Sequence, residues 1–237
     1  MPYRTLDRSR ITKTAEMLER RIAERFPQSS LRNVAREVAQ ATVELGSHAE
    51  AMAKPIWWLR AAVFLIVFGL IYLFSQIGTF IQIDTISSDD PTDLVQAVES
   101  AINTAVFAGI GIYTLANLEK RMKRSRALKS LHAMRSIIHI IDMHQLTKDP
   151  SAFSGGYHRT ENSPERTLTP NQLARYLDYC SELLSITGKT AALYAQSLDD
   201  DVVVGAVNDI ESLGTNLSRK IWQKIMLIDP QGAPAAA

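Results

Sequence analysis

The sequence predicts an all-α membrane protein, a two-span transmembrane helical hairpin with a cytoplasmic helical bundle. Three observations predict this fold class. Two long stretches carry no charged residue, and the charges around them are segregated by sign. The other stretches repeat apolar residues every three or four positions, which is typical of amphipathic helices. Nowhere does the alternating pattern of a half-buried strand compete with this interpretation.

The first uncharged stretch covers residues 61–81, which are 21 consecutive residues rich in Phe, Leu, Ile and Val. At about 1.5 Å of rise per residue, such a helix matches the roughly 30 Å hydrocarbon core of a bilayer. Trp57 and Trp58 precede it, and tryptophan is enriched at membrane interfaces. We therefore expect the first transmembrane helix at residues 55–81. A helix buried in a soluble core is the alternative, which the apolar composition on all sides disfavours.

The second uncharged stretch, residues 100–118, is less apolar, and the charges on its two sides support its assignment as a span. Residues 82–99 contain five Asp or Glu and no Lys or Arg, whereas basic residues follow residue 118 closely. Because Lys and Arg concentrate on the cytoplasmic side of spans, we expect an acidic external loop at 82–99. Both termini are then cytoplasmic, and the plasma (inner) membrane is the expected location of this multi-pass protein.

The whole-chain averages hide this pattern. The 237 residues have a net charge of +1, which divides into +4 over residues 1–60, −5 over 82–99 and +2 over 119–237. A near-neutral total excludes a strongly basic nucleic-acid binder, and we expect no nucleic-acid partner. The single cysteine, Cys180, excludes a disulfide-stapled domain. The residues ahead of the first span are polar, so we expect an uncleaved signal anchor.

The cytoplasmic parts divide into two helical regions. Residues 1–54 form an arm of two helices, the first ending near Pro27 and the second capped by Ser30. Residues 119–229 form a bundle, in which the helix of the second span continues from about Pro91 to about Leu146 without interruption. The bundle is completed by a loop at 147–169, a helix opened by Thr169 and Pro170, a last helix after the acidic turn 199–201, and a disordered tail at 230–237.

One polar cluster stands out on the long helix. His132, Arg135, His139 and Asp142 lie at spacings of three and four and therefore share a helix face. Three interpretations stay open: a buried hydrogen-bonded network, a surface for a partner, or a metal site made by His132, His139, Asp142 and His144. Asp178, Cys180 or Glu182 could add a further metal ligand. Since no metal motif of established spacing is present, we expect no metal or other cofactor.

The loop at residues 147–169 is rich in Ser, Gly, Pro and Thr. Loops of this length inside compact domains are either functional or mobile. A binding role would add Tyr157 and His158 to the candidate partner surface, and a simple connector is the alternative.

The basic run after the second span could bind anionic lipid headgroups, which attract juxtamembrane Lys and Arg. The candidates are Lys120, Arg121, Lys123, Arg124 and Arg126. The alternative is that these basic residues only determine the membrane topology, which requires the same charges.

Small and polar residues repeat along the second span. Ala101, Ala105 and Gly109 recur every four residues beside Asn103, so another helix could approach closely along that face. The approaching helix could be the first span or the same helix in a second copy, which would make a homo-oligomer possible.

The sequence contains no readable catalytic motif, so we expect no enzyme. The favoured function is a non-enzymatic scaffold, adaptor or sensor at the membrane, with a protein partner in the cytoplasm. An oligomeric channel or membrane-perturbing effector lined by the second span is the alternative, and a membrane-anchored metalloenzyme is the third.

Overall fold

The computed structural model describes residues 4–80, 91–153, 158, 160–163 and 167–228, and the regular secondary structure of these residues is helical with no strand. The elements are α1 (Arg8–Arg25), α2 (Ser30–Ala53), α3 (Trp57–Phe80), α4 (Pro91–Ala116), α5 (Leu118–Leu146), the short 3₁₀ helix η2 (Pro150–Phe153), α6 (Pro170–Ser197) and α7 (Asp201–Ile228). Their contacts divide the chain into two units, residues 1–54 with 124–237 and residues 55–123.

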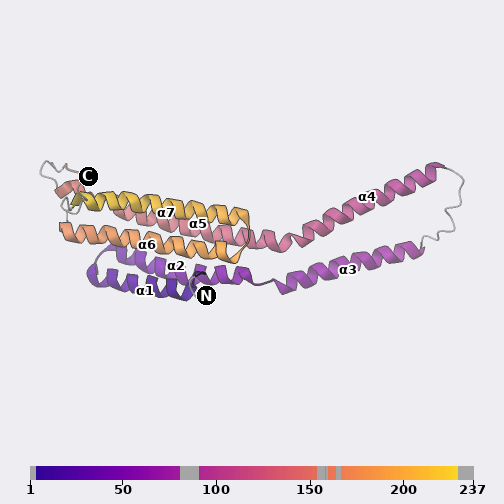
Figure 1. The fold of residues 1–237 in the computed structure, drawn as a ribbon, viewed down its shortest axis with the longest axis horizontal. Coiled ribbons are helices and arrows are strands. Elements are labelled where there is room, and N and C mark those ends of the chain that lie inside the picture. The colour runs from indigo at the N-terminus through magenta and orange to yellow at the C-terminus, as the bar shows by residue number, and fades with distance from the viewer. Residues whose placement is uncertain (1–3, 81–90, 154–157, 159, 164–166, 229–237) are drawn as a thin grey trace. The chain divides into compact units, whose positions relative to one another are not determined.

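The first unit is a bundle in which α1, α2, α6, α7 and the greater part of α5 run side by side (Figure 1). The apolar positions that the sequence predicts to face inward do so. Ile22, Leu31, Ile138, Leu177 and Ile221 are each fully buried in one continuous core. The N-terminal arm is therefore part of the bundle, because α1 and α2 both pack against α6.

Polar contacts fix the direction of each helix. The Leu6 backbone N–H donates to Gln196 Oε1 over 2.7 Å, so α1 begins beside the end of α6 and runs antiparallel to it. The Tyr194 hydroxyl donates to the Leu45 carbonyl over 2.9 Å, which places the ends of α6 and α2 together. At the far end of α5, Lys224 Nζ donates to Gln145 Oε1 over 2.7 Å.

Local sequence explains the helix starts. Thr169 caps α6 in a capping box with Gln172, and Pro170 occupies the first turn. The cap of α2 is Ser29, whose Oγ accepts from Leu31 N–H over 3.2 Å, and not Ser30 as the sequence suggests. Asp7 caps α1 through Ser9 N–H at 2.8 Å.

The second unit contains α3, α4 and the first turns of α5. The helix that the sequence predicts to be continuous over Pro91–Leu146 is divided at Asn117, where α4 ends and α5 begins. Hydrogen bonds from Asn117 N–H to the Tyr113 carbonyl and from Arg121 N–H to the Asn117 carbonyl flank this break. The Asn117 side chain also donates to the Tyr113 carbonyl over 2.8 Å, which competes with regular helix geometry.

In the described part of α3, residues 57–72, apolar side chains lie on all sides of the helix and most of them are exposed. Phe64, Leu65 and Phe68 are 67%, 75% and 70% exposed. By length and composition, the described residues contain one helical stretch suited to crossing a membrane; it lies within Ser30–Tyr72, and 6% of its most apolar window is buried. The second predicted span does not meet the same criteria and stays a prediction. Residues 82–90 of the predicted acidic loop, and the predicted tail at 230–237, lie outside the described residues.

Candidate functional site

The polar face predicted on α5 points to solvent. His132, Arg135 and His139 are exposed, and Asp142 is half-buried and accepts a hydrogen bond from Gln145 Nε2 over 2.6 Å. The interpretation as a buried polar network is therefore wrong, while a partner surface remains compatible with these positions. His158 is exposed, and Tyr157 lies outside the described residues.

The candidate metal ligands do not converge. Among the described residues, no group of three or more His, Cys, Asp or Glu side chains could hold a metal ion. His144 directs Nδ1 to the Ile140 carbonyl at 3.0 Å. The possible additional ligands on α6 are also engaged elsewhere. Asp178 pairs with Arg175, Glu182 pairs with Arg21, and Cys180 is fully buried.

The five basic residues predicted to bind lipid headgroups separate into two groups. Lys123 is buried and pairs with Glu119 at 2.9 Å, and Arg124 pairs with the buried Asp200 at 2.7 Å. Both side chains are thus engaged within the chain, which argues against their expected role at lipid headgroups. Lys120, Arg121 and Arg126 are exposed and keep that role as a prediction.

Glu119 joins the start of α3 to the start of α5. Its Oε2 accepts from Arg60 Nε over 2.7 Å, and its Oε1 accepts from the Ile56 backbone N–H over 3.2 Å and pairs with Lys123. Hydrogen bonds from Arg60 and then from Lys123 lower the pKa of Glu119 to about 2. The carboxylate therefore stays charged. It accepts from the Ile56 N–H, which has no partner within the helix because it lies at the start of α3.

The face predicted for span packing is open. Asn103, Ala105 and Gly109 are exposed, and a Cβ added at Gly109 would meet no atom within 4 Å. The Ala101 side chain lies outside the described residues. Since no described atom of α3 lies over Gly109, packing against the described part of the first span does not account for this glycine.

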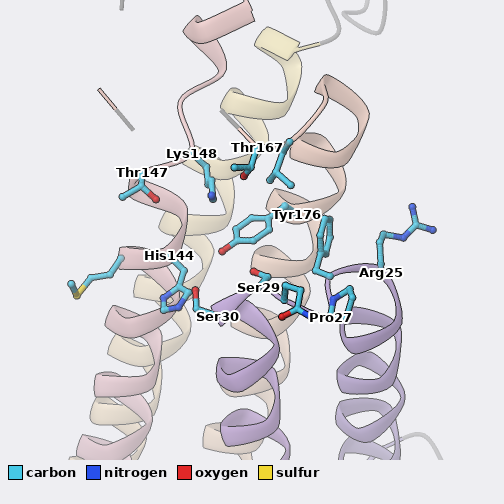
Figure 2. Close-up of a pocket in the computed structure, with 13 residues that line it drawn as sticks. Arg25, Pro27, Ser29, Ser30, His144, Thr147, Lys148, Thr167 and Tyr176 are labelled. Atoms are coloured by element: carbon cyan, nitrogen blue, oxygen red, sulfur yellow. The ribbon is translucent and has the colours of Figure 1, made fainter. Parts of the chain in front are cut away.

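The largest of the described pockets lies at one end of the bundle and has a volume of about 720 Å³. It forms where α1 ends, α2 begins, α5 ends and α6 begins. Figure 2 shows Lys148, Tyr176, Ser29 and His144 grouped around a common space, with Arg25 at the rim and pointing outward. Residues 147–148 and 167–168, the two ends of the loop for which the sequence leaves a binding role open, line this pocket.

Tyr176 forms the floor of the pocket and is 3% exposed. The Phe26 ring packs edge-on against it, with centroids 5.6 Å apart, and the Lys148 ammonium lies 5.1 Å from the Tyr176 ring centroid. Burial raises the pKa of Tyr176 to about 12, while a hydrogen bond with Ser29 opposes that rise. The hydroxyl is therefore protonated at neutral pH and is held in place beside the N-terminus of α2.

Sequence reasoning missed most of this site. Arg25, Ser29, Lys148 and Tyr176 belong to four different segments, and none of them lies in a motif. The one usable signal was the unusual length of the loop at 147–169.

No protein-family model matches the chain, and neither curated proteins nor solved structures provide a match.

Proposed function

We propose that the chain is a two-span integral membrane protein whose cytoplasmic helical bundle acts as a non-enzymatic scaffold, adaptor or sensor at the inner membrane. The observation that carries this proposal is the exposure of α3. A helix of a soluble core buries such side chains, whereas Phe64, Leu65 and Phe68 are each at least two-thirds exposed. Full burial of one such side chain is worth about 1.5–3 kcal/mol, so a whole helix of them requires an apolar surrounding.

The distribution of charge supports the orientation. Residues 82–99 carry five acidic residues and no basic one, and the exposed Lys120, Arg121 and Arg126 follow the second span. These three cations suit a cytoplasmic leaflet that contains anionic lipids. The two spans would return the chain to the same side, which unites the N-terminal arm with the remainder of the bundle.

Two surfaces of the bundle support a role in recognition. One is the exposed face of His132, Arg135 and His139 on α5. The other is the pocket at the end of the bundle. The α5 face lies outside the apolar core, whereas the pocket borders that core through Phe26 and Tyr176.

Cysteine accessibility in intact cells tests the topology. Cys180 is fully buried, so it can remain in place while one exposed cysteine is added. We expect a membrane-impermeant maleimide to label Ser88→Cys from outside, and Ser185→Cys only after permeabilisation. Extraction of the unmodified chain from membranes by alkaline carbonate, or equal labelling of both variants from outside, would contradict the proposal.

The recognition role needs a separate test. We expect a triple variant, His132→Ala with Arg135→Ala and His139→Ala, to lose a cytoplasmic protein captured by crosslinking in cells while membrane insertion is retained. A matched control, His48→Ala with Arg36→Ala, removes exposed polar side chains from α2. Capture that is the same for the triple variant and the control would exclude the α5 face as the partner surface.

A second candidate function is an oligomeric channel or membrane-perturbing effector lined by the second span. The open surface over Gly109, beside the exposed Asn103, favours it because a second copy could pack there. Native mass spectrometry from membranes measures the oligomeric state, and ion flux into liposomes measures conduction. We expect Asn103→Leu to reduce the flux, and a monomer without flux would exclude this candidate.

A further inference from the structure

We propose that the pocket at the end of the bundle binds a small organic molecule that carries a phosphate group. The binding site lies within the bundle alone, and only the choice between a free phosphate and a lipid headgroup rests on the proposed function. It starts from three features of the pocket, which are its charge, its donors and its size.

The charge of the pocket is one-sided. Thirteen described residues line it, and they include Arg25, His144 and Lys148 but no Asp or Glu. Among the described residues, neither Arg25 nor Lys148 forms an ion pair. The neighbouring carboxylates have partners of their own, since Asp142 accepts from Gln145 Nε2 at 2.6 Å and Asp149 accepts from Ser151 Oγ at 2.6 Å. Because Arg25 points outward at the rim, an anion entering the pocket would meet the Lys148 ammonium and would not have to displace a carboxylate from it.

Hydroxyl groups supply neutral donors around the same space. Ser29, Ser30, Thr147, Thr167 and Tyr176 all line the pocket. Figure 2 shows the Tyr176 hydroxyl and the Ser29 side chain close together on the side that faces His144. A phosphate has several acceptor oxygens and no need for a carboxylate partner, which matches a lining of cations and hydroxyls. The N-terminus of α2, which is capped by Ser29, adds a positive electrostatic potential to that of the Lys148 ammonium.

The pocket is held in shape before any ligand enters. The Tyr176 ring is fixed by Phe26 at 5.6 Å, and Lys148 is anchored by its backbone N–H, which donates to the Gln145 carbonyl over 3.1 Å. The ammonium group of Lys148 then lies over the buried ring. Binding therefore loses less side-chain entropy than it would at a mobile surface lysine.

The size of the pocket favours an organic phosphate over inorganic phosphate. Its volume of about 720 Å³ lies within the roughly 300–1,000 Å³ of typical small-molecule pockets. Phe26, Pro27, Met143 and Leu168 provide apolar lining for a carbon-containing part. Inorganic phosphate would contact the cations and leave this apolar lining in water.

The position of the pocket within the bundle bears on the source of the phosphate. The pocket lies at the start of α2, and the chain leaves the bundle for α3 at the other end of this 24-residue helix, ~36 Å away along its axis. A phosphate monoester could be free in solution or part of a lipid headgroup. Because the pocket lies at the end remote from both exits to the apolar helices, a free phosphate is favoured.

Calorimetric titration of the full chain in uncharged detergent tests the site, with AMP, ribose 5-phosphate, inorganic phosphate and adenosine as probes. We expect saturable binding of AMP or ribose 5-phosphate, weaker binding of inorganic phosphate, and none of adenosine. Vesicles that contain phosphatidic acid form a separate arm. If those vesicles bind and the soluble phosphates do not, with the same dependence on Lys148, the site stands and its phosphate comes from lipid.

Variants of Lys148 make the result specific. Lys148→Glu should weaken binding about ten- to a hundredfold, which corresponds to the loss of one charge-assisted hydrogen bond. Lys148→Arg should retain binding. Lys189→Glu makes the same change on an exposed part of α6 and should have no effect. Tyr176→Phe keeps the buried ring and should weaken binding by a smaller factor. Absence of saturable binding in every arm, or equal binding by the Lys148→Glu and Lys189→Glu variants, would overturn the proposal.

Discussion

Arg124 and Asp200 form a two-point ion pair in which the carboxylate is fully buried. Arg124 Nε donates to Asp200 Oδ2 over 2.8 Å, and Arg124 Nη2 lies 2.7 Å from the same oxygen, while the other carboxylate oxygen accepts from Arg124 Nε at 3.0 Å. Asp200 Oδ1 also accepts from the backbone N–H groups of Val202 and Val203 at the start of α7. A single carboxylate thus caps α7 and ties it to α5.

Replacing Asp200 should destabilise the bundle more than replacing its neighbour. Asp200→Ala removes both the cap and the buried partner of Arg124, which should cost about 2–4 kcal/mol in the free energy of unfolding. Asp199→Ala is the matched control, since Asp199 is exposed in the same turn. Denaturant unfolding followed by circular dichroism measures both. Equal loss in the two variants would show that Asp200 has no special role.

The Asp200 carboxyl also predicts a pH dependence. Burial raises its pKa, but hydrogen bonds from Arg124, Val203 and Val202 outweigh burial and hold the pKa below the ordinary value of 3.8. The stabilisation is therefore complete above about pH 4 and is lost as the pH falls through the folded-state pKa. We expect the melting temperature of the wild type to fall more steeply in this acid range than that of Asp200→Asn. Parallel curves would contradict this assignment.

Glu119 should stabilise the second unit as Asp200 stabilises the bundle, through a carboxylate that is ion-paired in the folded state. Glu119→Gln removes a charged partner from Arg60 and Lys123, and we expect a loss of about 1–2 kcal/mol because Arg60 is half-exposed and screened. The pKa of Glu119 is about 2 against an ordinary 4.5, so its contribution is present above pH 4.5 and disappears as the pH falls toward 2. Limited proteolysis near Pro55 in detergent should report the loosened start of α3. Glu99→Gln, at an exposed position on α4, should leave the cleavage rate unchanged.

The sequence predicts the bundle well because helical periodicity is a local property. Residues at spacings of three and four, such as Leu131, Met134, Ile138 and Ile141, share a face wherever the helix packs, and all four are buried. The interpretation of the polar face as a buried network failed for a related reason. His132 and His139 each follow a buried residue by one position, which turns them about 100° away from the core.

The ion pairs and the pocket could not be predicted from a single sequence. Arg124 and Asp200 are 76 residues apart, and no local pattern connects them. Lys123 and Arg124 looked equivalent to Lys120 because a run of basic residues does not reveal which of its members face a carboxylate. At the break, the Asn117 side chain donates to the Tyr113 carbonyl, and many helical asparagines do not form such a bond.

The contact between Tyr194 and Leu45 should contribute to docking of the N-terminal arm. The Tyr194 hydroxyl is buried and donates to the Leu45 carbonyl over 2.9 Å. Tyr194→Phe removes this bond without removing the ring, so we expect a loss of about 1 kcal/mol in the free energy of unfolding. Tyr113→Phe, at a position 71% exposed on α4, is the control and should have no effect. If Tyr194→Phe is as stable as the wild type, the hydroxyl gains as much from water in the unfolded chain as it gains from the Leu45 carbonyl in the folded chain.

The thiol of Cys180 should be inert until the bundle unfolds. Cys180 is fully buried on α6, and burial raises the pKa of its thiol to about 12, so both access and the reactive thiolate are lacking at neutral pH. We expect iodoacetamide to leave the native chain unmodified overnight and to modify it at once in guanidinium chloride, as measured by intact-mass spectrometry. Ser185→Cys adds an exposed thiol about one turn along the same helix and should gain a single adduct under native conditions. Rapid modification of Cys180 itself would mean that α6 opens away from the core far more often than a fully packed helix should.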